Sequence, residues 1–205
     1  TSDLSAFYFD IRKDTLYCEG EDSSVYHATL FTMHHIFQRL VRWFAPILSF
    51  TSEEAWLEKD PDANSIHSYS FLPCPPSWYQ PDLEDQWKHI LTLRRLILTA
   101  LEHTRTQGTI GSSLEAHVHV SLPNSDIETL PPYKLMEDVC IVSQITYHTT
   151  IPPSIVPFTE EDTKYQVWIE KAAGEKCERC WKISDDVKID SSLCPRCTNV
   201  IDTLR

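Results

Sequence analysis

Residues 26–44, YHATLFTMHHIFQRLVRWF, decide the fold class of this chain. Their apolar side chains recur every three or four positions, at Tyr26, Leu30, Met33, Phe37, Leu40 and Phe44. This spacing places them on one face of a long amphipathic helix. Pro46 follows and is expected to end or kink that helix. The stretch therefore predicts a mainly α fold built around a long helix.

A short helix, a turn and a loop are expected directly after Pro46. Thr51-Ser52-Glu53-Glu54 has the pattern of a capping box, which predicts a helix beginning there. Asp60-Pro61-Asp62 predicts a turn. Residues 61–82 hold five prolines with little periodicity, so they are expected to form a loop. The side chains expected to anchor this loop are Phe71, Trp78 and Tyr79.

A second long helix is predicted between about Leu83 and Gln107. The residues expected to form its buried stripe are Ile90, Leu93, Ile97 and Leu101. Gly108 and Gly111 lie just past its end, where a left-handed backbone conformation costs a glycine little.

The pattern changes after this helix to that of a small α/β region. Alternation in residues 116–122 predicts a half-buried strand that ends at Pro123-Asn124. The elements expected next are a helix near Tyr133–Asp138, a strand near Val142–Tyr147, a linker from Ile151, a strand at Tyr165–Glu170, and a metal-binding module introduced by Gly174.

These elements predict three parts: a helical bundle at 1–108, a small α/β subdomain with a linker at 109–170, and a zinc ribbon at 171–205. No stretch approaches the 18 consecutive apolar residues of a membrane span, so no membrane association is expected. Thr1 takes the place of a starting Met, which suggests an excised piece of a longer protein. We expect a monomer.

The cysteines and the charge restrict the class of protein. Seven cysteines, an odd number, with four in two Cys-x-x-Cys pairs, favour metal binding in a reducing, cytoplasmic compartment over a disulfide framework. The net charge is −12, but residues 171–205 carry seven basic and six acidic side chains, a net of +1, and residues 1–170 carry 11 and 24, a net of −13. This charge distribution argues against non-specific DNA binding as the function.

Four cysteines, Cys177, Cys180, Cys194 and Cys197, have the spacing of a zinc ribbon. A structural zinc ion takes four tetrahedral ligands, and each Cys-x-x-Cys turn offers two. With all four positions filled by cysteine, none is left for an activated water, so a catalytic zinc is disfavoured. A disulfide pair or a redox dithiol stays as the alternative, although a redox motif needs only one Cys-x-x-Cys pair.

Side chains around the metal suggest contact with RNA. Cations can bind phosphates and an exposed ring can stack on a base. The candidate residues in the ribbon are Lys176, Arg179, Trp181, Lys182 and Arg196. Arg94 and Arg105 lie eleven residues apart on one stripe of a helix that is positive within an acidic chain. The alternatives are that Trp181 covers the metal site as part of the core and that the cations are solvated surface.

Other clusters are discounted as sites. A metal role is not expected for His34-His35, which point to different helix faces, or for His117 and His119, which have no carboxylate or cysteine nearby in sequence. The residues expected to be buried or incidental thiols are Cys18, Cys74 and Cys140, and those expected to be core are Trp43, Trp56, Trp78 and Trp87. No catalytic motif or phosphate-binding glycine loop occurs.

Three segments together resemble a known family. They are Lys13-Asp14-Thr15-Leu16-Tyr17-Cys18, residues 45–56 (APILSFTSEEAW), and residues 110–116 (IGSSLEA). With the cysteine segments 176–181 and 193–197, and with Val142-Ser143-Gln144, they resemble the C-terminal part of bacterial-type isoleucyl-tRNA synthetases. A similar ribbon ends the formamidopyrimidine-DNA glycosylases, so the helical context decides between the two.

The resemblance implies a helical anticodon-binding bundle, a small α/β subdomain and a structural zinc ribbon that together grip the anticodon stem and loop of isoleucine tRNA. Catalysis, and with it ATP, would belong to a catalytic domain absent here, because the two nucleotide-binding signatures of the family are missing. Ser23-Ser24 and Gly108-Thr109 stand where many members carry basic residues, so no RNA contact is carried over to those positions.

Two other interpretations stay open. The ribbon could be a structural or protein-interaction module that packs on the parent enzyme without touching bases, in which case replacing Arg179 and Trp181 would not change tRNA affinity. A DNA-repair ribbon protein would need a catalytic N-terminal amine or acid and a basic groove, and Thr1 in an acidic chain supplies neither.

Overall fold

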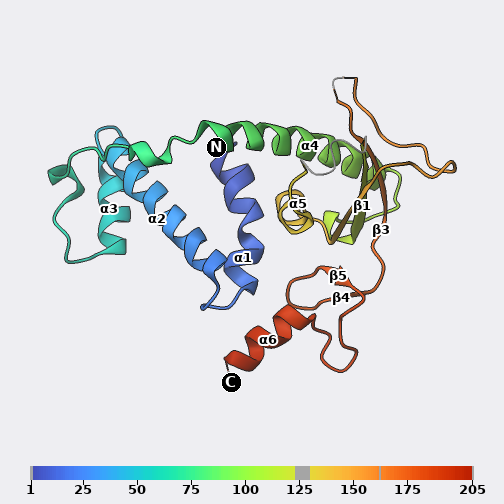
Figure 1. The fold of residues 1–205 in the computed structure, drawn as a ribbon. Helices are drawn as coiled ribbons and strands as arrows, with labels where there is room; N and C mark the ends of the chain where they lie inside the picture. The colour runs from blue at the N-terminus through green and yellow to red at the C-terminus, as the bar shows by residue number, and fades with distance from the viewer. Residues whose placement is uncertain (1, 123–129, 162, 205) are drawn as a thin grey trace. The chain divides into compact units, whose positions relative to one another are not determined.

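The computed structural model describes residues 2–122, 130–161 and 163–204 (Figure 1). The chain divides into two compact units. We call Glu21–Pro81 the helical unit, and Thr1–Gly20 with Asp82–Arg205 the mixed unit. The first twenty residues thus group with the C-terminal part of the chain. The three-part domain division remains a prediction.

The helical unit confirms the long helix but not the face that it buries. Helix α2 spans Ser24–Phe44, and the Ser23 hydroxyl accepts a hydrogen bond from the Tyr26 N–H at its start. The helix ends before Pro46, as predicted. No residue of the predicted stripe is fully buried; the buried residues of α2 are Thr29, Arg39, Val41 and Arg42. The small core of this unit is formed by Val41, Ala45, Trp56 and Ile66.

The predicted capping box is wrong. Helix α3 spans Ser49–Lys59, so it begins two residues before Thr51, and no side chain caps it. The Glu53 carboxylate instead accepts hydrogen bonds from the Ser65 hydroxyl at 3.0 Å and the Ile66 N–H at 2.8 Å. Glu53, the neighbour of the Glu54 expected to close the capping box, therefore ties the following loop to the helix.

The loop after α3 follows the prediction in part. The turn at Asp60 is confirmed by a hydrogen bond from the Ala63 N–H to the Asp60 carbonyl. Two single-turn 3-10 helices, η2 (Ile66–Ser68) and η3 (Pro76–Trp78), interrupt the loop. Of the three expected anchors, Trp78 stays half-exposed but contacts α2, with its ring centre 4.4 Å from the Arg39 guanidinium carbon. Phe71 and Tyr79 are exposed, which corrects their predicted role.

The mixed unit begins with two short helices and the second long one. A π-helix, η1 (Leu4–Phe9), leads into α1 (Lys13–Cys18). Helix α4, Pro81–Thr106, confirms the predicted second helix, and all four residues of its predicted stripe are buried. Gly108 has φ of 78°, as expected after a helix end. Gly111 does not have a positive φ; its N–H donates to the Glu115 carboxylate at 3.0 Å.

A three-stranded sheet packs beside α4 in the mixed unit. After a 3-10 turn, η4 (Ser113–Glu115), the strands are β1 (Ala116–Ser121), β2 (Gln144–His148) and β3 (Gln166–Lys171), in the order β2-β1-β3. β1 runs parallel to β2 and antiparallel to β3, and α5 (Tyr133–Cys140) connects β1 to β2 (Figure 1). β1 is almost wholly buried, not half-buried as predicted. The predicted end of this strand at Pro123-Asn124 lies outside the described residues.

Side chains of α4, the sheet and α5 form one core. Its fully buried members include Leu96, Ile97, Val118, Val120, Met136 and Val167. The ribbon follows, with β4 (Glu175–Lys176) antiparallel to β5 (Ile183–Ser184), and then α6 (Pro195–Thr203). The mainly α class with a small α/β part and a four-cysteine ribbon is confirmed. In the described part of the chain no helix is both long and apolar enough to span a bilayer.

Candidate metal centre and nucleic-acid interface

Local backbone geometry brings the two cysteine pairs of the ribbon together. Gly174 has φ of 102°, and a Cβ there would lie 2.3 Å from the Ser184 carbonyl carbon, so only glycine lets β4 approach β5 this closely. Cys177 and Cys180 follow in the turn after β4, while Cys194 caps α6 and Cys197 lies in its first turn. A second pairing, between Lys188 and Leu193, returns the chain to the first turn.

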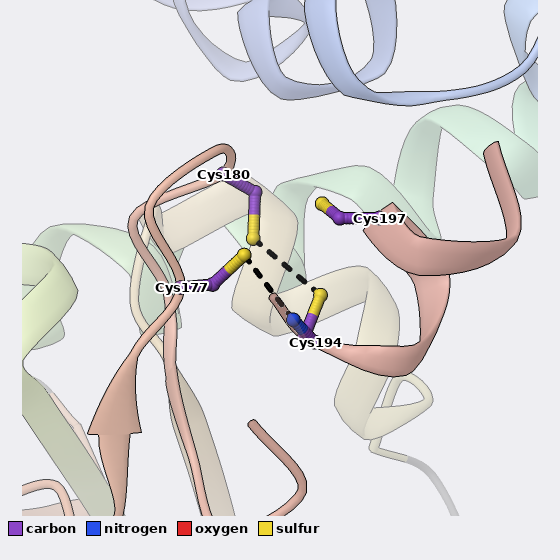
Figure 2. Close-up of side chains that lie close together, drawn as sticks. All are labelled: Cys177, Cys180, Cys194 and Cys197. Carbon is purple, nitrogen blue, oxygen red and sulfur yellow. Dashed lines mark hydrogen bonds between the residues drawn. The ribbon is translucent and has the colours of Figure 1, made fainter. Parts of the chain in front are cut away.

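The four sulfur atoms form the compact group that a tetrahedral metal needs. All four lie within 4.8 Å of one another, and Figure 2 shows Cys177, Cys180 and Cys194 facing one another with Cys197 alongside. The Cys180 and Cys194 sulfurs are 3.8 Å apart. Sulfurs bound to one zinc ion at about 2.3 Å would be separated by roughly 3.8 Å, whereas a disulfide requires about 2.05 Å. This geometry fits a metal and not a disulfide, and all seven cysteines are free.

Electrostatics at the four thiols also fit a divalent cation. Burial opposes ionisation of Cys177, but N–H groups of the two turns outweigh it and lower the pKa of this thiol to about 6. One of them is the Cys194 N–H, 3.4 Å from the Cys177 sulfur (Figure 2). Burial and neighbouring thiols raise the pKa of Cys180 and Cys197. A bound cation would offset the repulsion between neighbouring thiolates, because it stabilises the ionised form of all four cysteines.

Two of the predicted RNA-contacting arginines hold the ribbon to α1. The Arg196 guanidinium donates to the Asp14 carboxylate at 2.7 Å and to the Glu19 carboxylate at 2.8 Å, and all three side chains are about three-quarters buried. Arg179 donates to the carbonyls of Cys18 at 2.7 Å and Tyr17 at 3.2 Å. It also lies 3.7 Å from the Cys197 sulfur, so it links the metal group directly to α1.

A third predicted contact, Lys182, fixes the ribbon to α5. Its ammonium donates to the Asp138 carboxylate at 3.0 Å in a largely buried pair. Burial disfavours the charge, but Asp138 outweighs this and raises the pKa of Lys182. Next to it, the Ser143 hydroxyl accepts from the Ile183 N–H at 2.7 Å. The side chains that dock the ribbon are therefore cations that could, by their chemistry, have bound RNA phosphates instead.

Trp181 and Lys176 are the predicted ribbon residues that remain accessible. Trp181 has φ of 65°, and its side chain points outward, with the residue 59% exposed. The Lys176 ammonium lies 5.4 Å from the centre of its ring. Trp181 also borders a mainly apolar cavity of 420 Å³, whose other walls include Tyr17, Ile141 and Leu114. An exposed ring with a cation beside it and a cavity at its edge is suited to stack on a base.

The structure does not bring Arg94 and Arg105 together as one surface. Arg94 donates through Nε to the Val139 carbonyl at 2.9 Å, and its guanidinium carbon lies 4.9 Å from the centre of the Phe7 ring. It therefore joins α4 to α5 and to the N-terminal turn. Arg105 is exposed and lies 3.4 Å from Glu102.

Comparison with known proteins now gives the family. The profile described as "Anticodon-binding domain of tRNA ligase" matches residues 1–120, more than half of the chain. The chain belongs to this family. A second profile, "Zinc finger found in FPG and IleRS", matches residues 174–200, which include all four clustered cysteines.

The curated relatives of this chain agree with the predicted resemblance. It is 41% identical over 189 residues to the isoleucine–tRNA ligase of Bartonella henselae. The aligned residues cover 92% of the chain and 20% of the relative. It is 42% identical over 188 residues to that of Agrobacterium fabrum, and 41% identical over 200 residues to that of Ruegeria pomeroyi. The chain spans about a fifth of the length of these relatives.

Several residues that hold the ribbon in place could not be recognised as such from sequence. Asp14 and Glu19 are the acceptors that dock the ribbon, and they lie 182 and 177 residues from Arg196. Cys18, expected to be a buried or incidental thiol, is buried against the ribbon, and burial raises its pKa to about 11. Cys140 is buried and Cys74 exposed. Trp56 is core as predicted, whereas Trp43 and Trp78 are half-exposed.

A histidine cluster on the outer face of the sheet was also missed. His119 lies 2.9 Å from His148 between ring nitrogens and stacks on Trp168, with the two rings 10° from parallel. His117 and the Glu170 carboxylate flank it. The strand pairing brings Glu170 close, which sequence proximity could not show. The cluster does not have a metal-binding arrangement among the described residues, where only the four cysteines do.

The cluster predicts a stability loss in mild acid. Burial, and then His117 and His148, lower the pKa of His119 to about 4, below the value of about 6.5 in an unfolded chain. Between these two pKa values the unfolded state therefore binds more protons than the folded state. The contribution of neutral His119 to the free energy of unfolding is complete above about pH 6.5 and is lost as the pH falls toward about 4. We expect a loss on the order of 1–2 kcal/mol in urea unfolding. His119→Phe should flatten the profile, whereas His27→Asn, an exposed control, should not.

Proposed function

We propose that this chain is the tRNA-binding C-terminal part of an isoleucine–tRNA ligase. In this proposal the helical unit and the zinc ribbon bind the anticodon stem and loop of isoleucine tRNA, and the ATP-dependent reaction takes place in a catalytic domain outside these 205 residues. The observation that carries the proposal is the exposed Trp181 ring, with Lys176 beside it, on a ribbon of the matching family. The working form would be a cytoplasmic monomer.

In this proposal some residues would hold the ribbon in shape and others would contact the RNA. One zinc ion held by the four cysteine thiolates would supply a structural constraint that keeps the two turns together. Arg179, Arg196 and Lys182 would hold the ribbon against α1 and α5, so that the Trp181 ring is presented in a fixed direction. Trp181 would stack on a base, and Lys176 would contact a neighbouring phosphate.

Trp181→Ala is expected to weaken binding of isoleucine tRNA to the zinc-loaded chain. Loss of one stacked base costs about 1–3 kcal/mol, so the dissociation constant should rise roughly 5- to 150-fold at constant salt. Trp181→Phe should keep part of the affinity because it keeps a ring. The measurement is a titration with isoleucine tRNA and with the same tRNA altered in its anticodon.

The matched control is Ile189→Ala, which removes another apolar side chain, 91% exposed, from the same ribbon. It should leave affinity unchanged. Equal binding of the two tRNAs would exclude anticodon recognition and leave only contact with the backbone. Unchanged affinity of Trp181→Ala would instead favour the second candidate, a ribbon that is structural or binds protein. The observation in favour of that candidate is the internal use of Arg179, Lys182 and Arg196.

A further inference from the structure

The helical unit has an unusually apolar exposed corner where α2 passes into α3. We define the α2–α3 corner by its exposed side chains: Trp43, Phe44, Ile47, Leu48 and Phe50. Phe50 is 92% exposed and Ile47 78%. Five large apolar side chains within eight residues form a patch of the kind that soluble proteins cover with a partner.

A cavity beside this corner contains a buried cation without a counter-charge. The cavity, of 510 Å³, is lined by Arg42, Pro46, Tyr69 and Phe71, among others. Arg42 is only 7% exposed, and its guanidinium carbon lies 4.9 Å from the centre of the Trp56 ring and 5.2 Å from that of Tyr69.

The acceptors around Arg42 are all neutral. Its guanidinium donates to the Gln38 carbonyl at 2.6 Å and to the Gln38 side-chain oxygen, while its Nε has no partner. Within the described ranges no carboxylate pairs with it. Burial lowers the pKa of Arg42, as expected for a cation held by aromatic rings without an anion. A buried charge of this kind is costly unless an opposite charge reaches it.

The charges around the corner indicate what kind of partner fits. No Lys, Arg or His occurs from Trp43 to Glu58, whereas Glu53, Glu54 and Glu58 lie in this stretch. RNA and anionic lipid would meet carboxylates along this stretch, and the basic side chains that line the cavity are the recessed Arg42 and His67. A protein surface with apolar side chains and one Asp or Glu long enough to enter the cavity satisfies both the corner and Arg42.

We propose that the α2–α3 corner docks another domain of the same synthetase polypeptide, which inserts one carboxylate into the cavity at Arg42. This inference rests on the proposed function, since it requires the chain to be part of a longer ligase. The curated relatives are about five times as long as this chain, so each contains abundant protein that could supply the partner surface.

Radical footprinting of the intact synthetase and of the 205-residue chain tests the proposal. A side chain that is 92% exposed and becomes buried should lose about nine-tenths of its labelling, so labelling of Phe50 is expected to fall about tenfold in the intact enzyme without tRNA. Ile189, 91% exposed on the ribbon, is the control for labelling efficiency. Equal labelling of Phe50 in both proteins would overturn the proposal.

Other occupants give different results. Protection of Phe50 only when tRNA is added would assign the corner to RNA, and protection already in the isolated chain would assign it to this chain or to a second copy. Each of these outcomes refutes the docking proposal. Neither affects the Trp181 titration, so the proposed function stands or falls separately.

Arg42→Met separates docking from simple packing. None of the described carboxylates pairs with Arg42, so this substitution should leave the melting temperature of the isolated chain within about 1 °C or raise it. In the intact synthetase it would leave the partner carboxylate buried without a cation, and labelling of Phe50 should increase at least about threefold. A large destabilisation of the isolated chain with unchanged Phe50 protection in the intact enzyme would show that Arg42 is only a packing residue.

Discussion

Cys177→Ser, or removal of the metal by a chelator, is expected to unfold the ribbon while the α4–sheet core stays folded. The ribbon has almost no apolar core apart from its cysteines, since Cys177, Cys180 and Cys197 themselves make up most of the buried cluster there. Structural zinc sites contribute about 10–16 kcal/mol of apparent binding free energy in small modules. No burial of apolar surface in the ribbon could replace a contribution of that size.

Hydrogen exchange gives the local resolution that this prediction needs. Amides of Cys177, Trp181 and Thr198, which are hydrogen-bonded within the ribbon, should lose protection, whereas those of α4 around Leu96 should keep it. Cys74→Ser is the matched control, because Cys74 is an exposed thiol far from the cluster in sequence. Retained ribbon protection after verified metal loss would contradict a structural role for the metal.

The cluster of four cysteines could be predicted from sequence because its geometry is local. Each Cys-x-x-Cys turn fixes two sulfurs by itself, and the glycine at 174 marks where the hairpin begins. Only the way in which the two turns come together could not be predicted without the structure. The same holds for α2 and α4, because the spacing of their apolar residues predicted both helices, and Pro46 and Gly108 follow their ends.

The buried face of α2 could not be predicted, because periodicity finds an apolar stripe but not its partner. The helical unit offers little more than α3 and a short loop to pack on it, so side chains such as Leu30 and Phe44 stay exposed while Arg39 and Arg42 are buried under aromatic rings. An arginine stem is apolar, and its planar end stacks on tryptophan, so burial does not follow hydropathy here.

The roles of the ribbon cations depended on residues far away in the chain. A Lys or Arg that can bind phosphate can equally bind a carboxylate, and the acidic part of this chain supplies Asp14, Glu19 and Asp138. The negative net charge of −12 thus does not oppose RNA binding everywhere. Part of the negative charge pairs with cations of the ribbon inside the protein and so fixes the orientation of the ribbon. Lys176 then remains as the accessible cation beside Trp181.

Arg196→Met is expected to weaken tRNA binding through misplacement of the ribbon. The substitution removes a cation that pairs with two largely buried carboxylates, so Asp14 and Glu19 would be left uncompensated. Breaking such a pair costs about 3–5 kcal/mol, mainly as the penalty of the stranded charge. We therefore expect loss of ribbon docking, seen as increased hydrogen exchange at the Cys177 amide, together with weaker binding of isoleucine tRNA.

The triple variant Asp14→Leu/Glu19→Met/Arg196→Met distinguishes docking from direct RNA contact. Replacing all three charges of the buried cluster with apolar side chains should restore much of the stability, because a buried ion pair is worth little more than a well-packed apolar pair. If Arg196 only docks the ribbon, tRNA affinity should recover with stability, since Trp181 and Lys176 return to their places. If Arg196 contacts a phosphate, stability should recover without affinity, and the slope of affinity against salt should stay shallower by about one charge.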